Sequence, residues 1–379
     1  CADGYTAVAD YAAISECVDA CKGLGKPWAK GLVNGVLRTL QRQGEEKPDA
    51  ETLAESDHPE WLRSLLHRQY GDGALALMEG NNRRAPMTLR INQIAIPPDT
   101  FKQRLQTAKI SFADGPWPET VTLLDPQVAT DLPGWDQGEC AVQDQAAQHA
   151  AHLIMDALLS KGPSASPVKV LDACAAPGGK LFHLREVLTQ AGIEHHLFAL
   201  DNKATRLQEL SAIATRLGHI THPHADGSPL ASDSIGLICA DGCAIDLPLP
   251  ESLDIILIDA PCSGSGTIRR NPDIRLLLTE DGLRDQQALA SQLLQNVVQL
   301  WLPGGSLVYS QCASLCEANV QVIDRYLGGD AAGCVVNTSL AMGNATQYGW
   351  QLLPTEPLTD GFYYCMLKKG TDHNKADSP

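Results

Sequence analysis

The chain contains 379 residues, 44% of them hydrophobic and 20% charged, and carries a formal net charge of −16. This length accommodates two or three domains with buried cores. The acidic balance excludes a protein that binds nucleic acid through charge alone, because basic side chains supply most non-specific affinity for phosphate. No apolar run approaches the roughly 20 residues that cross a bilayer, and no secretory leader is recognisable. We therefore expect a cytoplasmic protein that does not bind membranes.

The first part of the chain predicts two small units. Residues 1–45 show Ala, Val, Ile and Leu at helical spacing, which predicts the C-terminal part of a helical domain. The chain starts at Cys1 inside this pattern, so we expect further sequence to precede it. Residues 46–140 begin with a linker-like polar run and predict a small α+β module. Its expected elements are two helical stretches and one strand, near 60–82, 98–107 and 87–91.

Residues 141–370 alternate between helical and strand-like patterns. This alternation predicts a parallel sheet with crossover helices, and hence an α/β domain of Rossmann-like type. The expected parallel strands are 168–173, 196–201, 235–240, 253–259 and 305–311. The expected helices are 142–160, 180–190, 203–217 and 283–301. Two later segments, 333–337 and 362–369, predict antiparallel strands that close the sheet, and residues 371–379 form a polar tail.

The segment after the first expected strand predicts a cofactor loop. Its small residues let backbone amides approach a ligand closely, and the N-terminus of the next helix faces the same point. The expected loop residues are Cys174, Ala175, Ala176, Pro177, Gly178, Gly179 and Lys180. The loop has neither the G-x-G-x-x-G fingerprint of dinucleotide-binding proteins nor a Walker pattern, which disfavours a nicotinamide dehydrogenase.

Acidic residues follow the next two strands. Asp201 ends the second strand, where a carboxylate can accept both ribose hydroxyls of a nucleoside cofactor; a helix N-cap is the structural alternative. Asp241 follows the third strand and can contact an adenine ring. Asp226 offers a competing match, but residues 235–240 form the more apolar strand pattern, which favours Asp241.

Two cysteines follow the fourth and fifth expected strands, in the sequences Asp259-Ala-Pro-Cys262 and Tyr309-Ser-Gln-Cys312. In a doubly wound sheet both strand ends open onto one crevice, so the two thiols can face one ligand. A thiolate that adds to C6 of a pyrimidine makes C5 nucleophilic enough to attack a sulfonium methyl. A second thiol or a carboxylate can then assist removal of the C5 proton. Burial as small apolar residues is the structural alternative.

The chain has 12 cysteines, which are scattered over expected core strands, and this favours reduced thiols over a disulfide framework. Three pairs share a C-x3-C spacing, and three histidines lie near the second pair. These residues are Cys17/Cys21, Cys239/Cys243 and Cys312/Cys316, with His219, His222 and His224. The usual zinc spacing is C-x2-C, which the sequence lacks, so we expect no metal site.

Taken in order, these motifs resemble the Sun/Fmu family of RNA cytosine-5 methyltransferases, in particular its bacterial members that act on 16S ribosomal RNA. The core segments that carry the resemblance are Asp172–Lys180, Asp259–Arg270, Asn271–Ile274 and Tyr309–Cys312. Segments similar to the N-terminal regions of the family are Gly31–Arg38, His58–Leu62, Met87–Asn92 and Val142–Gln145. The resemblance therefore covers nearly the whole chain.

The resemblance implies S-adenosyl-L-methionine as the cofactor, held by the loop together with Asp201, Asp241 and Asp259. It also implies Cys312 as the nucleophile and Cys262 as the thiol that helps to release the product.

The same resemblance implies a NusB-like RNA-binding domain in the N-terminal helices. It implies 16S ribosomal RNA as the partner, with Arg269 and Arg270 contacting phosphates or the target nucleotide. We expect this RNA to be unassembled or partly assembled and the protein to be a monomer, although the sequence does not determine the oligomeric state. The target nucleotide must leave its stack to enter a deep pocket.

The nucleophile motif departs from the family pattern. The family usually has Thr-Cys-Ser, whereas this chain has Gln311-Cys312-Ala313, and the acidic stretch that follows is reduced to Glu317-Ala-Asn319. Altered flanks change the orientation or the rate of the nucleophile. The alternatives are therefore a catalytically weak, RNA-binding ribosome-assembly factor and a cytosine-5 methyltransferase that acts on transfer RNA.

Overall fold

The computed structural model describes residues 10–43, 49–162, 166–224, 230, 234–244, 247–249, 252–329, 333–336, 339–355 and 358–370. The chain divides into two compact units, residues 1–53 and residues 54–379. Asp226 lies outside the described residues, as does the tail 371–379. Among the described residues, no helix combines the length and the apolar character that crossing a membrane requires.

The first unit is helical, as its sequence predicts. It contains α1 (Asp10–Gly23) and α2 (Lys30–Gln43), which are joined by a turn at Gly25, where φ is +68°. α2 leaves a row of apolar side chains exposed at Leu32, Val36 and Leu40. α3 (Ala50–Ser56) begins in this unit and ends in the second.

A helical pair opens the second unit. The expected stretch 60–82 is two helices, α4 (Glu60–Tyr70) and α5 (Gly73–Asn82), because the chain turns at Gly71 with a φ of +53°. Leu62, Leu65, Leu66, Leu77 and Met78 form an apolar cluster that also includes Leu283 and Leu315. This pair therefore packs directly on segments that flank the parallel sheet.

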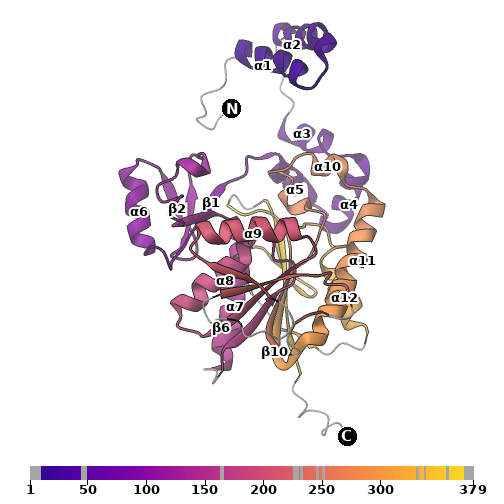
Figure 1. Ribbon diagram of the computed structural model, residues 1–379. Helices are drawn as coiled ribbons and strands as arrows, with labels where there is room; N and C mark the ends of the chain where they lie inside the picture. Colours follow the sequence, from indigo (N-terminus) through magenta and orange to yellow (C-terminus); the bar gives the residue numbers. More distant parts are fainter. Residues whose placement is uncertain are drawn as a thin grey trace. The chain divides into compact units, whose positions relative to one another are not determined.

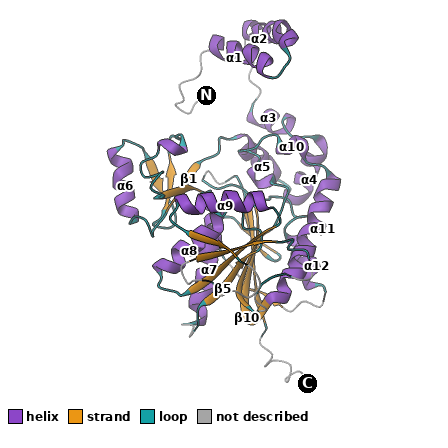
Figure 2. Cartoon of the chain, in the orientation of Figure 1, coloured by secondary structure: helices purple, strands orange, loops and turns teal. Residues whose placement is uncertain are grey.

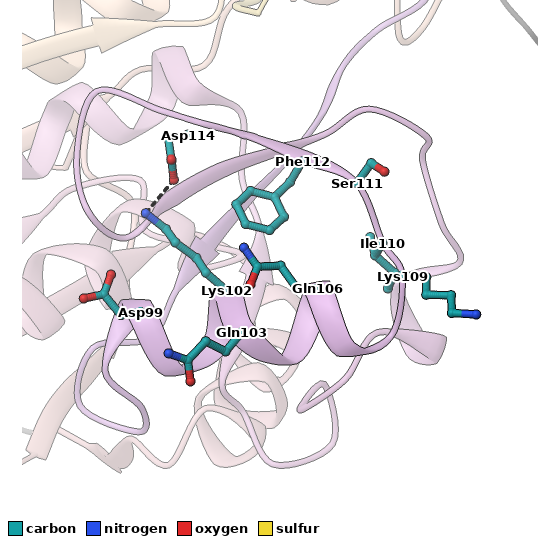
Figure 3. A pocket seen from close by; sticks show the side chains of 9 residues that line it. All are labelled: Asp99, Lys102, Gln103, Gln106, Lys109, Ile110, Ser111, Phe112 and Asp114. Atoms are coloured by element: carbon teal, nitrogen blue, oxygen red, sulfur yellow. Dashed lines mark ion pairs between the residues drawn. The ribbon is translucent and has the colours of Figure 1, made fainter.

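A four-stranded antiparallel sheet follows in the order β2-β3-β1-β4. Its strands are β1 (Met87–Ile91), β2 (Phe112–Asp114), β3 (Thr120–Leu123) and β4 (Cys140–Val142). One face packs on α6 (Pro98–Thr107) through Phe101 and Leu105. Figure 3 shows a shallow hollow between α6 and β2, crossed by an ion pair of 2.6 Å between Lys102 and Asp114. The sequence predicts only β1, because the other strands are too short to show an alternating pattern.

The other strands of the described residues form a ten-stranded sheet in the order β12-β13-β14-β10-β9-β5-β6-β8-β7, with β11 paired to β14. Figures 1 and 2 show this sheet between two groups of helices. The parallel strands are β5 (Val168–Asp172), β6 (His195–Asp201), β7 (Ile220–Pro223), β8 (Ser234–Cys239), β9 (Leu253–Asp259) and β10 (Trp301–Gln311). The antiparallel strands are β11 (Gly333–Val336), β12 (Asn344–Thr346), β13 (Gly349–Leu352) and β14 (Phe362–Lys369). The predicted Rossmann-like α/β fold is confirmed.

Helices cover both faces of this sheet. Side chains of α7 (Gln145–Lys161), α8 (Gly179–Gln190) and α9 (Ala204–Arg216) share one core cluster, and those of α11 (Glu280–Val297) and α12 (Val320–Leu327) share the other. A short helix, α10 (Ile274–Leu277), precedes α11. The strand order reverses at β5, which has β6 on one side and β9 on the other. Ligands of doubly wound sheets bind at the carboxyl ends of the strands around such a point.

Candidate active site

The cofactor loop lies between β5 and α8. Gly178 has a φ of +104°, and a Cβ atom built there would lie 2.3 Å from the ring of Phe182. Its amide donates to the carbonyl of Ala175 at 2.7 Å, which closes a tight turn against the start of α8. Glycine is therefore required at this position both by the backbone conformation and by the close approach of α8.

Three of the expected cofactor residues line one cleft at the carboxyl ends of β5, β6 and β8. Cys174, Asp201 and Asp241 contribute to its wall. The carboxylate of Asp201 accepts from the amide of Lys203 at 3.0 Å and forms an ion pair with Arg206 at 3.0 Å, so the position also serves the start of α9. β8 lies next to β6 in the sheet, which places Asp241 beside Asp201.

Two further acidic residues, Asp172 and Asp259, end the strands β5 and β9 at the same edge of the sheet. Burial, and then the nearby charge of Asp259, raise the pKa of Asp172 to about 7. The ammonium of Lys180 lies 2.6 Å from the carboxylate of Asp259, and the hydroxyl of Ser310 donates to that carboxylate at 3.1 Å. Burial lowers the pKa of Lys180, but the charge of Asp259 and its hydrogen bond outweigh this effect, so the net shift is upward and the ammonium is retained.

The two cysteines meet at the ends of adjacent strands. β9 and β10 are paired in parallel, and the Sγ atoms of Cys262 and Cys312 lie 3.2 Å apart. The hydrogen bond from Cys312 lowers the pKa of Cys262, and the same contact together with burial raises the pKa of Cys312. The pair therefore favours one thiolate and opposes a second.

The loop after Cys312 is held by residues that the sequence patterns do not indicate. The side chains of Asn319 and Gln351 both donate to the carbonyl of Ala313, at 3.0 and 3.1 Å. The unusual Gln311 donates to the carbonyl of Pro261 at 3.4 Å, which ties the two cysteine-bearing loops together. The departures in the nucleophile motif thus take part in local hydrogen bonds that position Cys312.

The helical pair α4 and α5 also reaches this loop. The amide of Gln69 donates to both carboxylate oxygens of Glu317, at 2.9 and 2.7 Å, and the hydroxyl of Tyr70 donates to the carbonyl of Ser314. These contacts join residues more than 240 positions apart. No local sequence pattern predicts contacts between residues so far apart along the chain.

Arg269 and Arg270 share one acidic partner. The guanidinium of Arg269 is buried and donates to Asp360 at 2.7 Å. Arg270 donates to both Asp360 and Asp144, and its side chain is 29% exposed. Arg270 is therefore the more accessible of the two expected RNA contacts.

Comparison with known proteins matches three family models to successive parts of the chain. The sequence model of the family described as 16S rRNA methyltransferase RsmB/F matches residues 163–368. A ferredoxin-like domain of RsmF/B-like methyltransferases matches residues 58–130, and the NusB family matches residues 4–42. The ribosomal RNA small subunit methyltransferase B of Enterobacter sp. (strain 638) is 34% identical over 371 residues, which cover 96% of this chain and 79% of that protein. The chain belongs to the RsmB/F methyltransferase family.

One more relative and two solved structures are also similar to this chain. A probable ribosomal RNA small subunit methyltransferase B of Coxiella burnetii is 34% identical over 96% of this chain and 81% of its own length. Among solved structures, a methyltransferase homolog from Pyrococcus horikoshii shares the fold with a TM-score of 0.67 and 24% identity, over 85% of this chain and 99% of that one. NSun6 from the same organism shares it with a TM-score of 0.70 and 17% identity, over 83% and 99%.

S-adenosylmethionine is the cofactor of this RsmB/F methyltransferase, as the sequence predicts, and the cleft fits it. The acidic residues around the loop complement a cofactor that carries a sulfonium, and Asp201 and Asp241 offer carboxylates for hydroxyl and amino groups. The tight turn at Gly178 lets backbone amides face the ligand. When bound, the cofactor supplies an electrophilic methyl group.

Proposed function

We propose that this protein methylates C5 of a specific cytosine in 16S ribosomal RNA through a covalent bond between Cys312 and C6 of the base. One observation carries the proposal: two thiols lie 3.2 Å apart beside the cofactor loop. The names of the family and of the relatives supply the RNA substrate. Neither name specifies the atom that is methylated or the intermediate, which rest on the chemistry of the two cysteines.

The pKa shifts favour the thiolate on Cys262 in the resting pair. The reaction begins when the proton of Cys312 passes to Cys262, which leaves Cys312 as the thiolate and Cys262 as the thiol. The sulfur of Cys312 adds to C6, and the electron pair of the C5–C6 double bond moves toward C5. A bound cofactor would supply the methyl group that C5 receives. Cys262 loses its own proton to solvent and, as a thiolate, takes the proton from C5, while the bond between C6 and Cys312 breaks. The starting protonation returns, with one proton released for each methyl transferred.

Lys180 and Asp259 assist this cycle because both charges act on Cys312. The charge of Lys180 opposes the effects that raise the pKa of Cys312, and it neutralises Asp259, which lies close enough to disfavour a thiolate. We propose that this ammonium holds Cys312 in its reactive form.

The acidic net charge requires a local RNA contact. We propose that Arg270 provides part of it, since it lies beside the cysteine loop on the chain and is partly exposed. The target base must leave its stack to reach sulfurs at the strand ends, so RNA that is free or only partly assembled is the expected substrate, and a single chain holds the complete site.

The test measures transfer of labelled methyl from S-adenosylmethionine to unmodified 16S RNA, with bisulfite mapping of the product. Wild type should produce 5-methylcytosine at one position, Cys312→Ala should produce none, and Cys262→Ala should accumulate a protein–RNA adduct that survives denaturation. Cys316→Ala is the matched control, because Cys316 lies in the same loop with a thiol whose pKa burial raises to about 11.

Three outcomes would overturn parts of the proposal. Methyl transfer by Cys312→Ala would remove the nucleophile assignment. Methylation of transfer RNA but not of 16S RNA would replace the substrate. No transfer by a folded wild type that binds the cofactor would favour a non-catalytic RNA-binding role.

A further inference from the structure

Three potential metal ligands converge at the junction between the four-stranded sheet and the helices of the catalytic sheet. They are Glu119, which directly precedes β3, His152 of α7 and His183 of α8. Within the part of the chain that the structure describes, this group alone brings one ligand atom from each of three such residues within 4.8 Å of one another. We propose that these three residues bind one Zn²⁺ ion, which fastens the small module to α7 and α8.

The distances suit a tetrahedral ion. The Oε1 atom of Glu119 lies 2.8 Å from Nε2 of His152 and 3.1 Å from Nε2 of His183. Zinc binds imidazole nitrogen and carboxylate oxygen at about 2.0–2.2 Å, which places neighbouring ligands of a tetrahedral ion roughly 3.4 Å apart. To admit the ion, the Glu119 oxygen needs to move apart from His152 by about 0.6 Å and from His183 by about 0.3 Å. All three ligand atoms already lie within 4.8 Å of one another.

The three side chains are held in place by their surroundings. The indole of Trp117 stacks on the ring of His152, with centroids 4.0 Å apart and planes at 6°. The rings of His152 and His183 meet edge to face at 5.3 Å. The side chains of Glu119 and His183 are 2% and 1% exposed, whereas that of His152 is 22% exposed. The cluster is thus rigid on its buried side and open to solvent on one side, through which an ion can enter.

The types of ligand atom determine which metal the cluster favours. Two imidazole nitrogens and one carboxylate oxygen suit zinc and its neighbours in the first transition row, while magnesium and calcium prefer oxygen ligands alone. Three protein ligands leave the fourth position of a tetrahedral ion to a water molecule, which the exposed side of His152 allows. The expectation of no metal site rests on cysteine spacing, and this cluster contains no cysteine.

The test is a titration of the full chain with Zn²⁺ against a fluorescent chelator, in a Cys262→Ser/Cys312→Ser background. That background is needed because two thiols 3.2 Å apart can also bind zinc. We expect one equivalent of tightly bound zinc, a raised unfolding temperature with zinc, and X-ray absorption that shows nitrogen and oxygen neighbours without sulfur. His152→Ala should weaken binding by about a hundredfold or more, since loss of a ligand exceeds the loss of a supporting contact.

The matched control is His149→Ala, which removes a histidine one helical turn away on α7, outside the cluster. It should keep the bound zinc and the zinc-dependent rise in unfolding temperature. Absence of stoichiometric binding in the background protein would overturn the proposal, as would equal affinity in His152→Ala. Circular dichroism shows whether His152→Ala, a change at a partly exposed position, retains the native fold.

Discussion

Helix α8 contacts two differently charged regions. At its N-terminus, beside the cleft, Lys180 lies close to Asp172 and Asp259, and burial raises the pKa of Asp172 to about 7. Further along, its buried Glu186 forms a bidentate ion pair with Arg90, with both distances at 2.9 Å. The cleft keeps an excess of negative charge that a cationic cofactor can balance, whereas the junction balances its charges internally. The first region is arranged to bind a ligand and the second to hold two parts together.

The junction should be the more sensitive region to loss of one charge. Replacing Arg90 by methionine leaves Glu186 buried without its cation, and such a loss costs about 3–5 kcal/mol of unfolding free energy. The guanidinium also donates to the side chain of Gln143 and to the carbonyl of Gly179, both at 2.6 Å. Urea denaturation measures the effect. The double variant Arg90→Met/Glu186→Met should recover part of the lost unfolding free energy. If its loss equals the sum of the losses in the single variants Arg90→Met and Glu186→Met, this account is contradicted.

A charge change in the cleft should affect catalysis more than stability. Lys180→Met removes the cation beside Asp259 and Cys312, so we expect kcat to fall on the order of 100-fold. Single-turnover methyl transfer over a range of pH measures this, and the pH at which activity rises should move upward. Lys180→Arg, which keeps the charge, should retain more activity than the methionine variant. An unchanged pH profile in Lys180→Met would show that the lysine does not act on the thiol.

The crowding of carboxylates in the cleft predicts an unusual dependence of stability on pH. The pKa of Asp172 is raised from 3.8 to about 7, so the folded protein binds a proton that the unfolded chain has already lost. Stability from this group therefore decreases as pH rises from about 4 to about 7, and is constant above that range. Asp172→Asn removes the penalty, and its stability advantage over wild type should grow by about 3 kcal/mol between pH 5 and pH 8. Equal advantages at both pH values, in urea denaturation, would exclude a raised pKa.

The smallest expected change in unfolding free energy is at an exposed arginine. Arg284 pairs with Glu280 at 3.8 Å and with Asp281, and its side chain is 65% exposed. Arg284→Ala should change the unfolding free energy by less than about 0.5 kcal/mol, because solvent screens such pairs. Arg90→Met is measured under the same conditions. A decrease in unfolding free energy above about 1 kcal/mol in Arg284→Ala would show that burial does not explain why the two substitutions are expected to differ.

The sequence predicts those parts of the fold whose signal is local. β5 and β9 appear as short apolar runs, and the residues that follow each run lie at the strand ends because parallel strands share one orientation. This is why the approach of Cys262 to Cys312 could be predicted from two separate motifs.

The features that escape prediction depend on contacts between distant segments. Arg90 and Glu186 are 96 positions apart, and each by itself reads as an ordinary solvent-exposed charge. β7 is a short edge strand with mostly exposed side chains, so it lacks the apolar pattern that marks its neighbour β8. The convergence of Glu119 with two histidines likewise requires the packing of β3 on α7 and α8, which no spacing along the chain encodes.

The contacts of Arg90 bear on how this protein can be rearranged by engineering. The guanidinium of Arg90 donates to the carbonyl of Gly179, where α8 starts, and to the carboxylate of Glu186, two turns further along the same helix. A transplant limited to the methyltransferase match at residues 163–368 would leave that arginine behind and remove the cation that pairs with the buried Glu186. The smallest portable piece therefore includes the antiparallel sheet, and chimaeras within this family should be joined upstream of β1.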